Sequence, residues 1–237
     1  MDNYPGILVG ILTCDLYNYC ADELEQTIKT FSYPNYDILF IDNSETYEFF
    51  NKLKEKGFNV IKTKRLQKWR DILLEGHNIL IDKALEGNYD FLFLLDADTI
   101  PPKDVLERLV KHNKKVVSGL YFNYFTINGV RDYYPIIRIE IPGEKEKWTV
   151  PNQDIWGTKE LIKIVCAGTG CLLLHKDIIK KYKFWYEKES KGADDIFFFK
   201  SLLNDNVGAW CDTSIICKHL LKNKLVFAKD FYKSGEY

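Results

Sequence analysis

Two aspartates one residue apart, Asp96 and Asp98, stand at the end of a strongly apolar segment. Residues 91–95 read FLFLL, and the chain passes from them directly into DADT. Two carboxylates spaced in this way just past a strand can both reach one hard cation, and Mg²⁺ or Mn²⁺ keeps further positions for water and phosphate oxygens. The alternative is a turn in which one aspartate caps a helix that starts near Pro102. Capping needs only one aspartate, so the pair favours a metal site and chemistry on phosphate.

A second acidic pair, Asp194 and Asp195, and a late histidine, His219, could complete such a site. The acidic pair opens a helical pattern after KGA, and His219 lies in CKHL between apolar segments. Acidic residues are also favoured in the first turn of any helix, and an isolated histidine is most often structural. The functional interpretation therefore depends on all three features occurring together.

Alternating strand and helix patterns must position these residues. Apolar runs bounded by turn residues predict strands over 7–12, 36–42, 58–63 and 89–95. Apolar residues three and four apart predict helices over 21–31, 45–57 and 69–87. This alternation implies parallel strands joined by crossovers, with helices covering both faces of the sheet.

The carboxyl ends of parallel strands share one edge of a sheet, and ligands bind beyond that edge. Asp15 follows the first predicted strand, Asp42 and Asn43 follow the second, and Asp96 and Asp98 follow the fourth. We expect these side chains to lie along one rim and to form a site.

The regular alternation ends after residue 120. Residues 119–150 are rich in aromatic side chains and carry turn signals at 128–129 and 142–143, which predicts an irregular or antiparallel excursion. Further patterns predict a strand over 171–175, a helix over 194–205, and a strand or hairpin over 208–220. The sequence shows no internal repeat and no Pro/Ser-rich linker, so we expect one mixed α/β domain over residues 1–237.

An aromatic cluster lies in the excursion, over 121–125, with Tyr133, Tyr134, Trp148 and Trp156 farther along. Such flat apolar faces can stack on sugars, and they can equally form part of a core. The sequence leaves both interpretations open.

Composition excludes several classes of protein. The chain has 33 basic and 34 acidic residues, a formal net charge of -1, and 46% hydrophobic residues, so it shows no nucleic-acid footprint. No segment approaches the ~18 apolar residues of a membrane helix, and the first 20 residues do not read as a signal peptide. The six cysteines lack metal-site spacing, which indicates buried thiols in a reducing compartment. We expect a cytoplasmic protein, and a peripheral position at a membrane is compatible with the sequence.

Taken together, these motifs resemble those of the GT-A-fold glycosyltransferases, especially the family-2 group, which use nucleotide sugars and a D-x-D motif. The order and spacing of the motifs carry the resemblance, and they span nearly the whole chain. They are GILTCD (10–15), FIDNSE (40–45), LLDADT (94–99), GTGCLLLHKDII (168–179), GADDIFFFKSL (192–202) and CKHL (217–220). The resemblance implies a mostly parallel sheet flanked by helices, with a nucleotide-sugar-binding half over 1–119 and an acceptor-binding half over 120–237.

The resemblance also implies donor-binding residues. Thr13, Asp15 and Asp42, with Asn43, would surround the base and ribose. Asp96 would contact the ribose-diphosphate. Many relatives carry Arg-Asn where this chain has EGHN at 75–78, so the phosphate contact would pass to His77, or to Arg65 or Arg70 nearby.

The same resemblance implies the metal ligands and the base. Asp96 and Asp98 would bind the divalent metal, His219 would complete its shell, and Asp195, with Asp194 beside it, would supply the general base. An imidazole ligand suits Mn²⁺ somewhat better than Mg²⁺. The implied reaction moves a sugar from a UDP- or GDP-sugar to a hydroxyl of a glycan, lipid-linked or small-molecule acceptor, with inversion at the anomeric carbon.

Three other classes stay open. A haloacid-dehalogenase-type phosphatase also places D-x-D after an apolar strand and uses Mg²⁺, but there the motif normally follows the first core strand. A sugar-1-phosphate nucleotidyltransferase would carry a Gly-rich N-terminal loop that residues 6–15 lack. A catalytically idle carbohydrate-binding relative would have no reason to retain the acidic pairs and the histidine.

Overall fold

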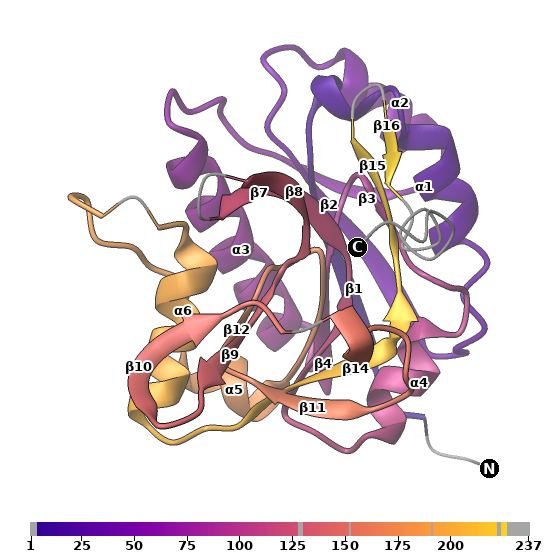
Figure 1. The fold of residues 1–237 in the computed structure, drawn as a ribbon. Coiled ribbons are helices and arrows are strands. Elements are labelled where there is room, and N and C mark those ends of the chain that lie inside the picture. Colours follow the sequence, from indigo (N-terminus) through magenta and orange to yellow (C-terminus); the bar gives the residue numbers. More distant parts are fainter. Residues whose placement is uncertain (1–3, 128–129, 152, 191, 222–223, 227–237) are drawn as a thin grey trace.

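An eight-stranded sheet runs through the middle of the protein (Figure 1). The computed structural model describes residues 4–127, 130–151, 153–190, 192–221 and 224–226. In spatial order the strands are β11 (Leu161–Ile164), β14 (Ala209–Ile216), β6 (Val116–Leu120), β13 (Cys171–His175), β4 (Phe91–Asp96), β1 (Ile7–Thr13), β2 (Tyr36–Asp42) and β3 (Asn59–Lys62). The strands β4, β1, β2 and β3 are mutually parallel, which confirms the prediction for this half of the chain.

The other half of the sheet is mixed. β13 pairs antiparallel with both β4 and β6, β14 is parallel to β6, and β11 is antiparallel to β14. The prediction that residues 171–175 form a core strand is confirmed, because β13 lies between β4 and β6 with residues 171–174 buried. β6 and β11 were not predicted from the sequence.

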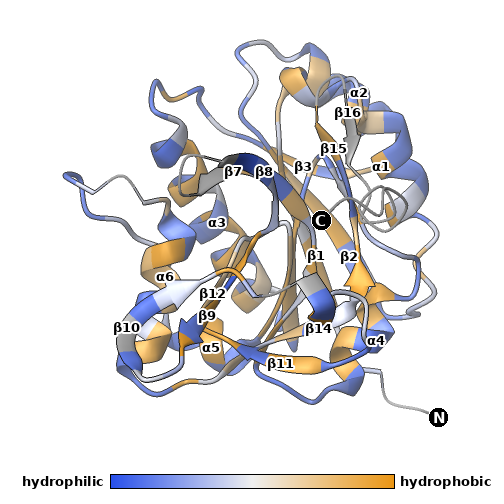
Figure 2. Ribbon diagram, viewed as in Figure 1, coloured by the Kyte–Doolittle hydropathy of each residue, from blue (hydrophilic) through white to orange (hydrophobic). Residues whose placement is uncertain are grey.

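Helices cover both faces of this sheet. The helices are α1 (Ala21–Ile28), α2 (Glu48–Glu55), α3 (Trp69–Glu86), α4 (Val105–Lys111), α5 (Lys176–Lys181) and α6 (Asp194–Asn204), with 3₁₀ turns η1 (Asp15–Tyr17) and η2 (Gln153–Ile155). The buried residues of α3, α5 and α6 share one core cluster, and those of α1, α2 and α4 share the other. Figure 2 shows the corresponding pattern, with hydrophobic strands at the centre and polar outer helix surfaces.

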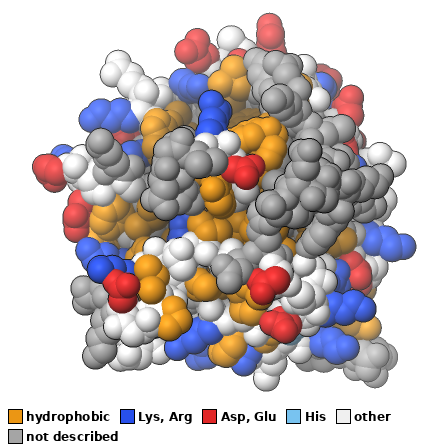
Figure 3. Space-filling view, viewed as in Figure 1, with side chains coloured by type: hydrophobic (Ala, Val, Ile, Leu, Met, Phe, Trp, Pro, Cys, Tyr) orange, Lys and Arg blue, Asp and Glu red, His pale blue; other side chains and the backbone are white. Residues whose placement is uncertain are grey.

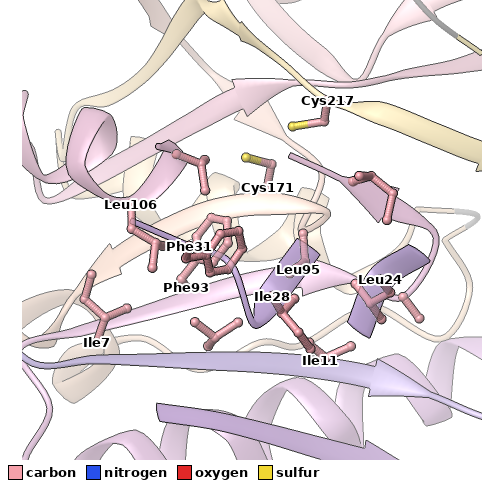
Figure 4. Close-up of a cluster of buried hydrophobic side chains, with 14 of the residues drawn as sticks. Ile7, Ile11, Leu24, Ile28, Phe31, Phe93, Leu95, Leu106, Cys171 and Cys217 are labelled. Carbon is pink, nitrogen blue, oxygen red and sulfur yellow. The ribbon is translucent and has the colours of Figure 1, made fainter. Parts of the chain in front are cut away.

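Side chains of β4 alternate between the two cores, as the period of two in a strand requires. Leu92 and Leu94 face the first cluster, and Phe91, Phe93 and Leu95 face the second. Figure 4 shows Phe93 and Leu95 packed with side chains of α1 and α4 and of neighbouring strands. Burying one such side chain contributes roughly 1.5–3 kcal/mol. The β4 strand is thus fixed from both sides, and so is the position of its carboxyl end.

Within the described residues, three small sheets lie outside the main one. β7 (Phe122–Ile127) and β8 (Val130–Pro135) form an antiparallel pair. β9 (Ile137–Ile141) pairs with β10 (Glu144–Thr149) and with β12 (Cys166–Ala167). β15 (Lys218–Leu221) pairs with β5 (Thr99–Ile100) and with β16 (Lys224–Val226). The predicted antiparallel excursion is confirmed; of its two turn signals, Pro142–Gly143 joins β9 to β10, and residues 128–129 lie outside the described residues.

The DADT segment does not cap a helix. After Asp98 the chain forms β5, and α4 begins only at Val105 with Asp104 before it. All six cysteines are buried thiols, as predicted. In the part of the chain that the structure describes, no helix has the length and apolar character needed to cross a membrane.

Candidate active site

The parallel register brings the predicted site residues of the first half to one edge of the sheet. Thr13 is paired with Asp42, Leu12 with Asp96, and Asp42 with Lys62. The carboxyl ends of β1, β2, β3 and β4 therefore stand side by side. This confirms the prediction that the polar residues at these strand ends lie along one edge of the sheet. Each of these side chains is held in place by the paired strand that carries it.

The Asp96 carboxylate lies against three residues of the second half of the chain. Thr169 Oγ1 donates to Asp96 Oδ1 at 3.4 Å, and the Gly170 N–H donates to the Tyr121 hydroxyl at 3.0 Å. Burial and the neighbouring charge of Asp98 raise the pKa of Asp96 to about 6, and a hydrogen bond with Tyr121 acts in the opposite direction. Asp96 is thus a carboxylate held where added positive charge would be stabilising.

Gly170 permits this close approach. A Cβ at this position would lie 2.6 Å from Asp96 Oδ2 and 2.6 Å from Tyr121 Cζ, distances that real side chains do not adopt. We expect Gly170→Ala to displace the Asp96 carboxylate and to lower turnover at least about tenfold, since an ångström of misplacement can cost ~10²-fold.

The measurement for Gly170→Ala is the steady-state rate of the sugar transfer that the sequence resemblance implies. Gly6→Ala is the matched control, because its added Cβ would meet nothing closer than 3.7 Å. Equal loss of activity in both variants, or none in Gly170→Ala, would contradict the role of Gly170.

Asp98 and His219 are brought together by the pairing of β5 with β15. His219 lies opposite Thr99 in this pair, and its Nε2 is 3.3 Å from Asp98 Oδ1. His219 Nδ1 lies 2.7 Å from the Phe122 carbonyl oxygen, which can only accept. That carbonyl therefore fixes the ring proton on Nδ1 and leaves Nε2 directed at Asp98.

Two backbone contacts hold this part of the site. The Leu220 N–H donates to the Asp98 carbonyl at 2.7 Å, and the Tyr19 hydroxyl donates to the Leu220 carbonyl at 2.6 Å. Burial alone would lower the pKa of His219, but the hydrogen bond and charge of Asp98 raise it above its usual value. Tyr19 is a residue of this site that the sequence analysis did not single out. Gly170 lies in the GTGCLLLHKDII motif and Tyr121 in the aromatic cluster over 121–125, but the sequence predicted no contact of either with Asp96.

The side chains of this site fit a divalent cation whose coordination shell is completed by water or a bound ligand. A metal-binding histidine normally donates its other ring N–H to a carbonyl or carboxylate, and His219 has that arrangement. Among the described residues no cluster of three or more His, Cys, Asp or Glu side chains forms a ready-made metal site. Asp98 and His219 are in contact and the charge of Asp96 acts on His219, so these side chains suit an ion such as Mn²⁺ or Mg²⁺ that takes its other ligands from water and phosphate.

The residues predicted to contact the nucleoside lie near the ends of β1 and β2. Asp42 has no exposed surface. Its Oδ1 accepts hydrogen bonds from the Ser44 hydroxyl at 2.5 Å and from the Ser44 N–H at 3.1 Å. Its Oδ2 lies 3.5 Å from Lys62 Nζ. Thr13 is buried, and Asp15 is exposed with its N–H bonded to Ser44 Oγ at 2.8 Å. Their contacts with a nucleoside remain predictions.

A basic cavity of about 660 Å³ opens beside these residues. Arg65 lines it and donates from Nη1 to Asn43 Oδ1 at 2.9 Å, and Lys62 and Lys64 line it as well. Positive side chains at the rim of the parallel strands are suited to an anionic ligand. Arg70 lies elsewhere, donating to the carbonyls of Ser190 and Glu187.

The two aspartates at the start of α6 occupy different environments. Asp194 is 1% exposed, and its Oδ2 lies 2.7 Å from Nδ1 of His77, which is itself 2% exposed and packed on the Phe184 ring. Asp194 Oδ1 also accepts the backbone N–H of Asp195 at 3.1 Å. The structure thus uses His77 to hold Asp194, and a phosphate contact through His77 remains a prediction.

Asp195, by contrast, faces a cavity of about 400 Å³ that residues of the second half of the chain line. Burial and the charge of Asp194 raise the pKa of Asp195 to about 6, and Asp96 acts in the same direction. Gly168 lines the same cavity and lies against the Tyr121 hydroxyl, which connects the cavity with the surroundings of Asp96. Asp195 is therefore a carboxylate suited to proton transfer near neutral pH.

The arrangement as a whole defines a class of protein. The GT-A fold has a mixed sheet whose parallel strands end in polar residues. This protein has such a sheet, with a D-x-D motif at the end of β4 and an acidic pair at the start of α6. The structure is similar to that of GalNAc-T7 with UDP, GalNAc and Mn²⁺, with a TM-score of 0.65 and 13% identity over 94% of this chain and 45% of the other. It is also similar to the mannosyltransferase PcManGT from Pyrobaculum calidifontis in complex with GDP-Man and Mn²⁺, with a TM-score of 0.62 and 14% identity over 94% of this chain and 59% of the other.

The family follows from the sequence match. The model of glycosyl transferase family 2 matches residues 15–183, well over half of the chain, and the protein belongs to this family. It is a glycosyltransferase, which decides against the phosphatase and the nucleotidyltransferase. A search of curated proteins finds no match. The chain spans about half the length of the two solved structures above, and at 13–14% identity they establish the fold alone.

Proposed function

We propose that the protein transfers a sugar from a UDP- or GDP-sugar to an acceptor hydroxyl with inversion, in a metal-dependent reaction that uses Asp195 as general base. The observation that carries the proposal is the contact between His219 Nε2 and Asp98, just past the end of β4, with the charge of Asp96 acting on His219 and the ring fixed by the Phe122 carbonyl. UDP with Mn²⁺ and GDP-Man with Mn²⁺ occur in the two similar structures, which supports both donor classes.

Different residues suit the two substrates, the sugar donor and the acceptor. The donor diphosphate would lie between Asp96 and Asp98 and the basic cavity that Arg65 lines. The acceptor would enter on the side of the cavity that Asp195 lines. The metal, when bound by Asp96, Asp98 and His219, would neutralise charge on the leaving diphosphate.

Asp195 carries the proton step. The acceptor oxygen forms a bond to the anomeric carbon as the bond from that carbon to the diphosphate oxygen breaks. The electron pair of the broken bond leaves with the diphosphate, and the acceptor proton passes to the Asp195 carboxylate. Attack on the face opposite the leaving group inverts the anomeric configuration, as in the general-base half of inverting glycoside chemistry. Asp194 and His77 keep Asp195 in place.

Thermal unfolding with nucleotides tests the proposal. A ligand that binds only the folded state at ~100 times its dissociation constant adds ~2.7 kcal/mol to stability, so UDP or GDP with Mn²⁺ is expected to raise the melting temperature by several degrees. The same nucleotide without metal should give a much smaller shift, and CMP and ADP should give none. Equal shifts with and without Mn²⁺ would contradict metal-dependent donor binding, and no shift with any nucleotide would contradict the donor class.

A further inference from the structure

The cavity beside Asp195 has a largely apolar lining. Its walls come from the β7, β9 and β10 strands, from the segments around β8 and β12, and from the start of α6. The large apolar side chains in this lining are Phe125, Ile136, Ile137, Trp148 and Ile196. Figure 3 shows hydrophobic side chains exposed around a hollow near the middle of this face of the molecule. This surface suits a ligand with a hydrocarbon or flat apolar part.

Among the described residues, Arg138 is the cationic side chain that lines the same cavity. Arg138 is half-buried in β9, and its Nη1 donates to the Ile137 carbonyl at 2.8 Å and to the Pro135 carbonyl at 3.3 Å. Its guanidinium also lies over the Phe125 ring, 5.3 Å from the centroid. Among the described residues, Nε and Nη2 have no hydrogen-bond partner, and Asp195, whose charge acts on the guanidinium, does not form an ion pair with it.

A half-buried charge of this kind normally has a counter-charge. Removing a cation from water is costly unless an anion and hydrogen-bond acceptors replace the water. Burial lowers the pKa of Arg138, and the charge of Asp195 across the cavity acts in the opposite direction without offsetting the burial. The guanidinium offers planar paired donors that match a carboxylate or phosphate, and two of its nitrogens remain available for that purpose.

We propose that the acceptor bound in this cavity carries an oxyanion, a carboxylate or a phosphate, that pairs with Arg138, together with an apolar portion that lies on Phe125 and Trp148. This inference rests on the proposed function, since it takes Asp195 as the base. Asp195 and Arg138 line one cavity with opposite charges, so they also orient the acceptor: the oxyanion is repelled by Asp195 and goes to Arg138, which leaves a neutral hydroxyl for Asp195.

The test compares the binding of matched probes by titration calorimetry, below their micelle concentrations. Octyl β-glucoside and octyl β-glucuronide share the ring and the alkyl chain and differ in one carboxylate, and octyl phosphate carries the other oxyanion on the same chain. A charge-assisted hydrogen bond in a desolvated site corresponds to about tenfold to a hundredfold in affinity. We expect the wild-type protein to bind at least one anionic probe tighter than octyl β-glucoside by that factor. The tighter of the two names the source of the oxyanion.

Three variants separate the role of Arg138 from general effects. Arg138→Met keeps an apolar side chain of similar length and should lose the preference for the anionic probe, while its affinity for octyl β-glucoside stays within about threefold. Arg138→Lys should retain part of the preference. Arg131→Met is the control, since Arg131 is an exposed arginine on neighbouring β8 and should not affect it.

Several outcomes would overturn the inference. Equal binding of neutral and anionic probes by the wild type would do so, and so would an undiminished preference in Arg138→Met, or an equal loss in Arg131→Met. The nucleotide shift with Mn²⁺ should persist in Arg138→Met, which also confirms that this variant folds. A wild-type protein that prefers the anionic probe but shows no metal-dependent nucleotide shift would refute the proposed function and leave the anion-binding cavity standing.

Discussion

Asp195→Asn is expected to lower the turnover number by about 10²–10⁴-fold, because a positioned general base contributes a factor of that size. Asparagine keeps the shape of the side chain and the oxygen that accepts the Ile196 N–H at 2.7 Å, but it cannot take up the acceptor proton. The stabilisation of the protein by nucleotide with Mn²⁺ should be unchanged. Steady-state transfer and the melting temperature with nucleotide measure the two properties separately.

The pH dependence of the wild-type enzyme should report the same carboxylate. Because the pKa of Asp195 is raised to about 6 and the base must be ionised, the turnover number should rise as the pH increases through about 6 and then level off. The groups that act on this carboxylate are Asp194, His77 and Asp96. An unchanged pH profile in Asp195→Asn, measured on its residual activity, would argue against this assignment.

Stability gives an independent check on Asp195. Its pKa is higher in the folded protein than the ordinary value of 3.8, so the folded state binds more protons and its stability falls as the pH rises from about 4 to about 6. Asp195→Asn removes the carboxylate that causes this pH-dependent fall in folding stability. Above pH 6 the variant protein should therefore be at least as stable as the wild type. Asp177→Asn is the matched control, a first-turn aspartate of α5 whose ion pair with Lys115 is exposed and contributes little. A loss of activity accompanied by a lower melting temperature would point to misfolding.

Asp98→Asn is expected to abolish the stabilisation that nucleotide and Mn²⁺ confer together, a loss of up to ~2.7 kcal/mol at ~100 times the wild-type dissociation constant. Asparagine retains the size of the side chain and leaves intact the Leu220 N–H bond to the backbone carbonyl of residue 98. It removes the negative charge that faces His219 and that the cation would neutralise. Melting curves with nucleotide, with and without Mn²⁺, measure the effect.

Asp22→Asn serves as the control for that experiment. The Asp22 side chain is 87% exposed and paired only with Lys56 among the described residues, so its loss should leave the metal-dependent shift intact. An Asp98→Asn protein that keeps the full shift would remove Asp98 from donor binding and leave Asp96 and His219 to be tested. A shift lost in both variants would indicate a general electrostatic effect.

Much of the first half of the fold could be predicted from local sequence. The strands β1 to β4 and the helices α1 to α3 follow from apolar spacing and turn residues, and the parallel arrangement follows from their alternation. Because parallel strands end at one edge, the rim that carries Asp42, Asp96 and Asp98 could be predicted as well. The second half was predicted less well, since short strands such as β6 and β11 have no distinctive period.

The sequence by itself determined which residues could do the chemistry. It identified the D-x-D at the end of β4, the acidic pair at the start of α6 and the late His219, because residue type and spacing are local properties. The tertiary structure decided their partners. It brings His77 into contact with Asp194, 117 residues farther along the chain. The pairing of β5 with β15 brings His219 to Asp98. The pairing of β13 with β4 brings Gly170 close to Asp96. Such contacts depend on how distant strands and helices pack together, and no local pattern encodes that packing.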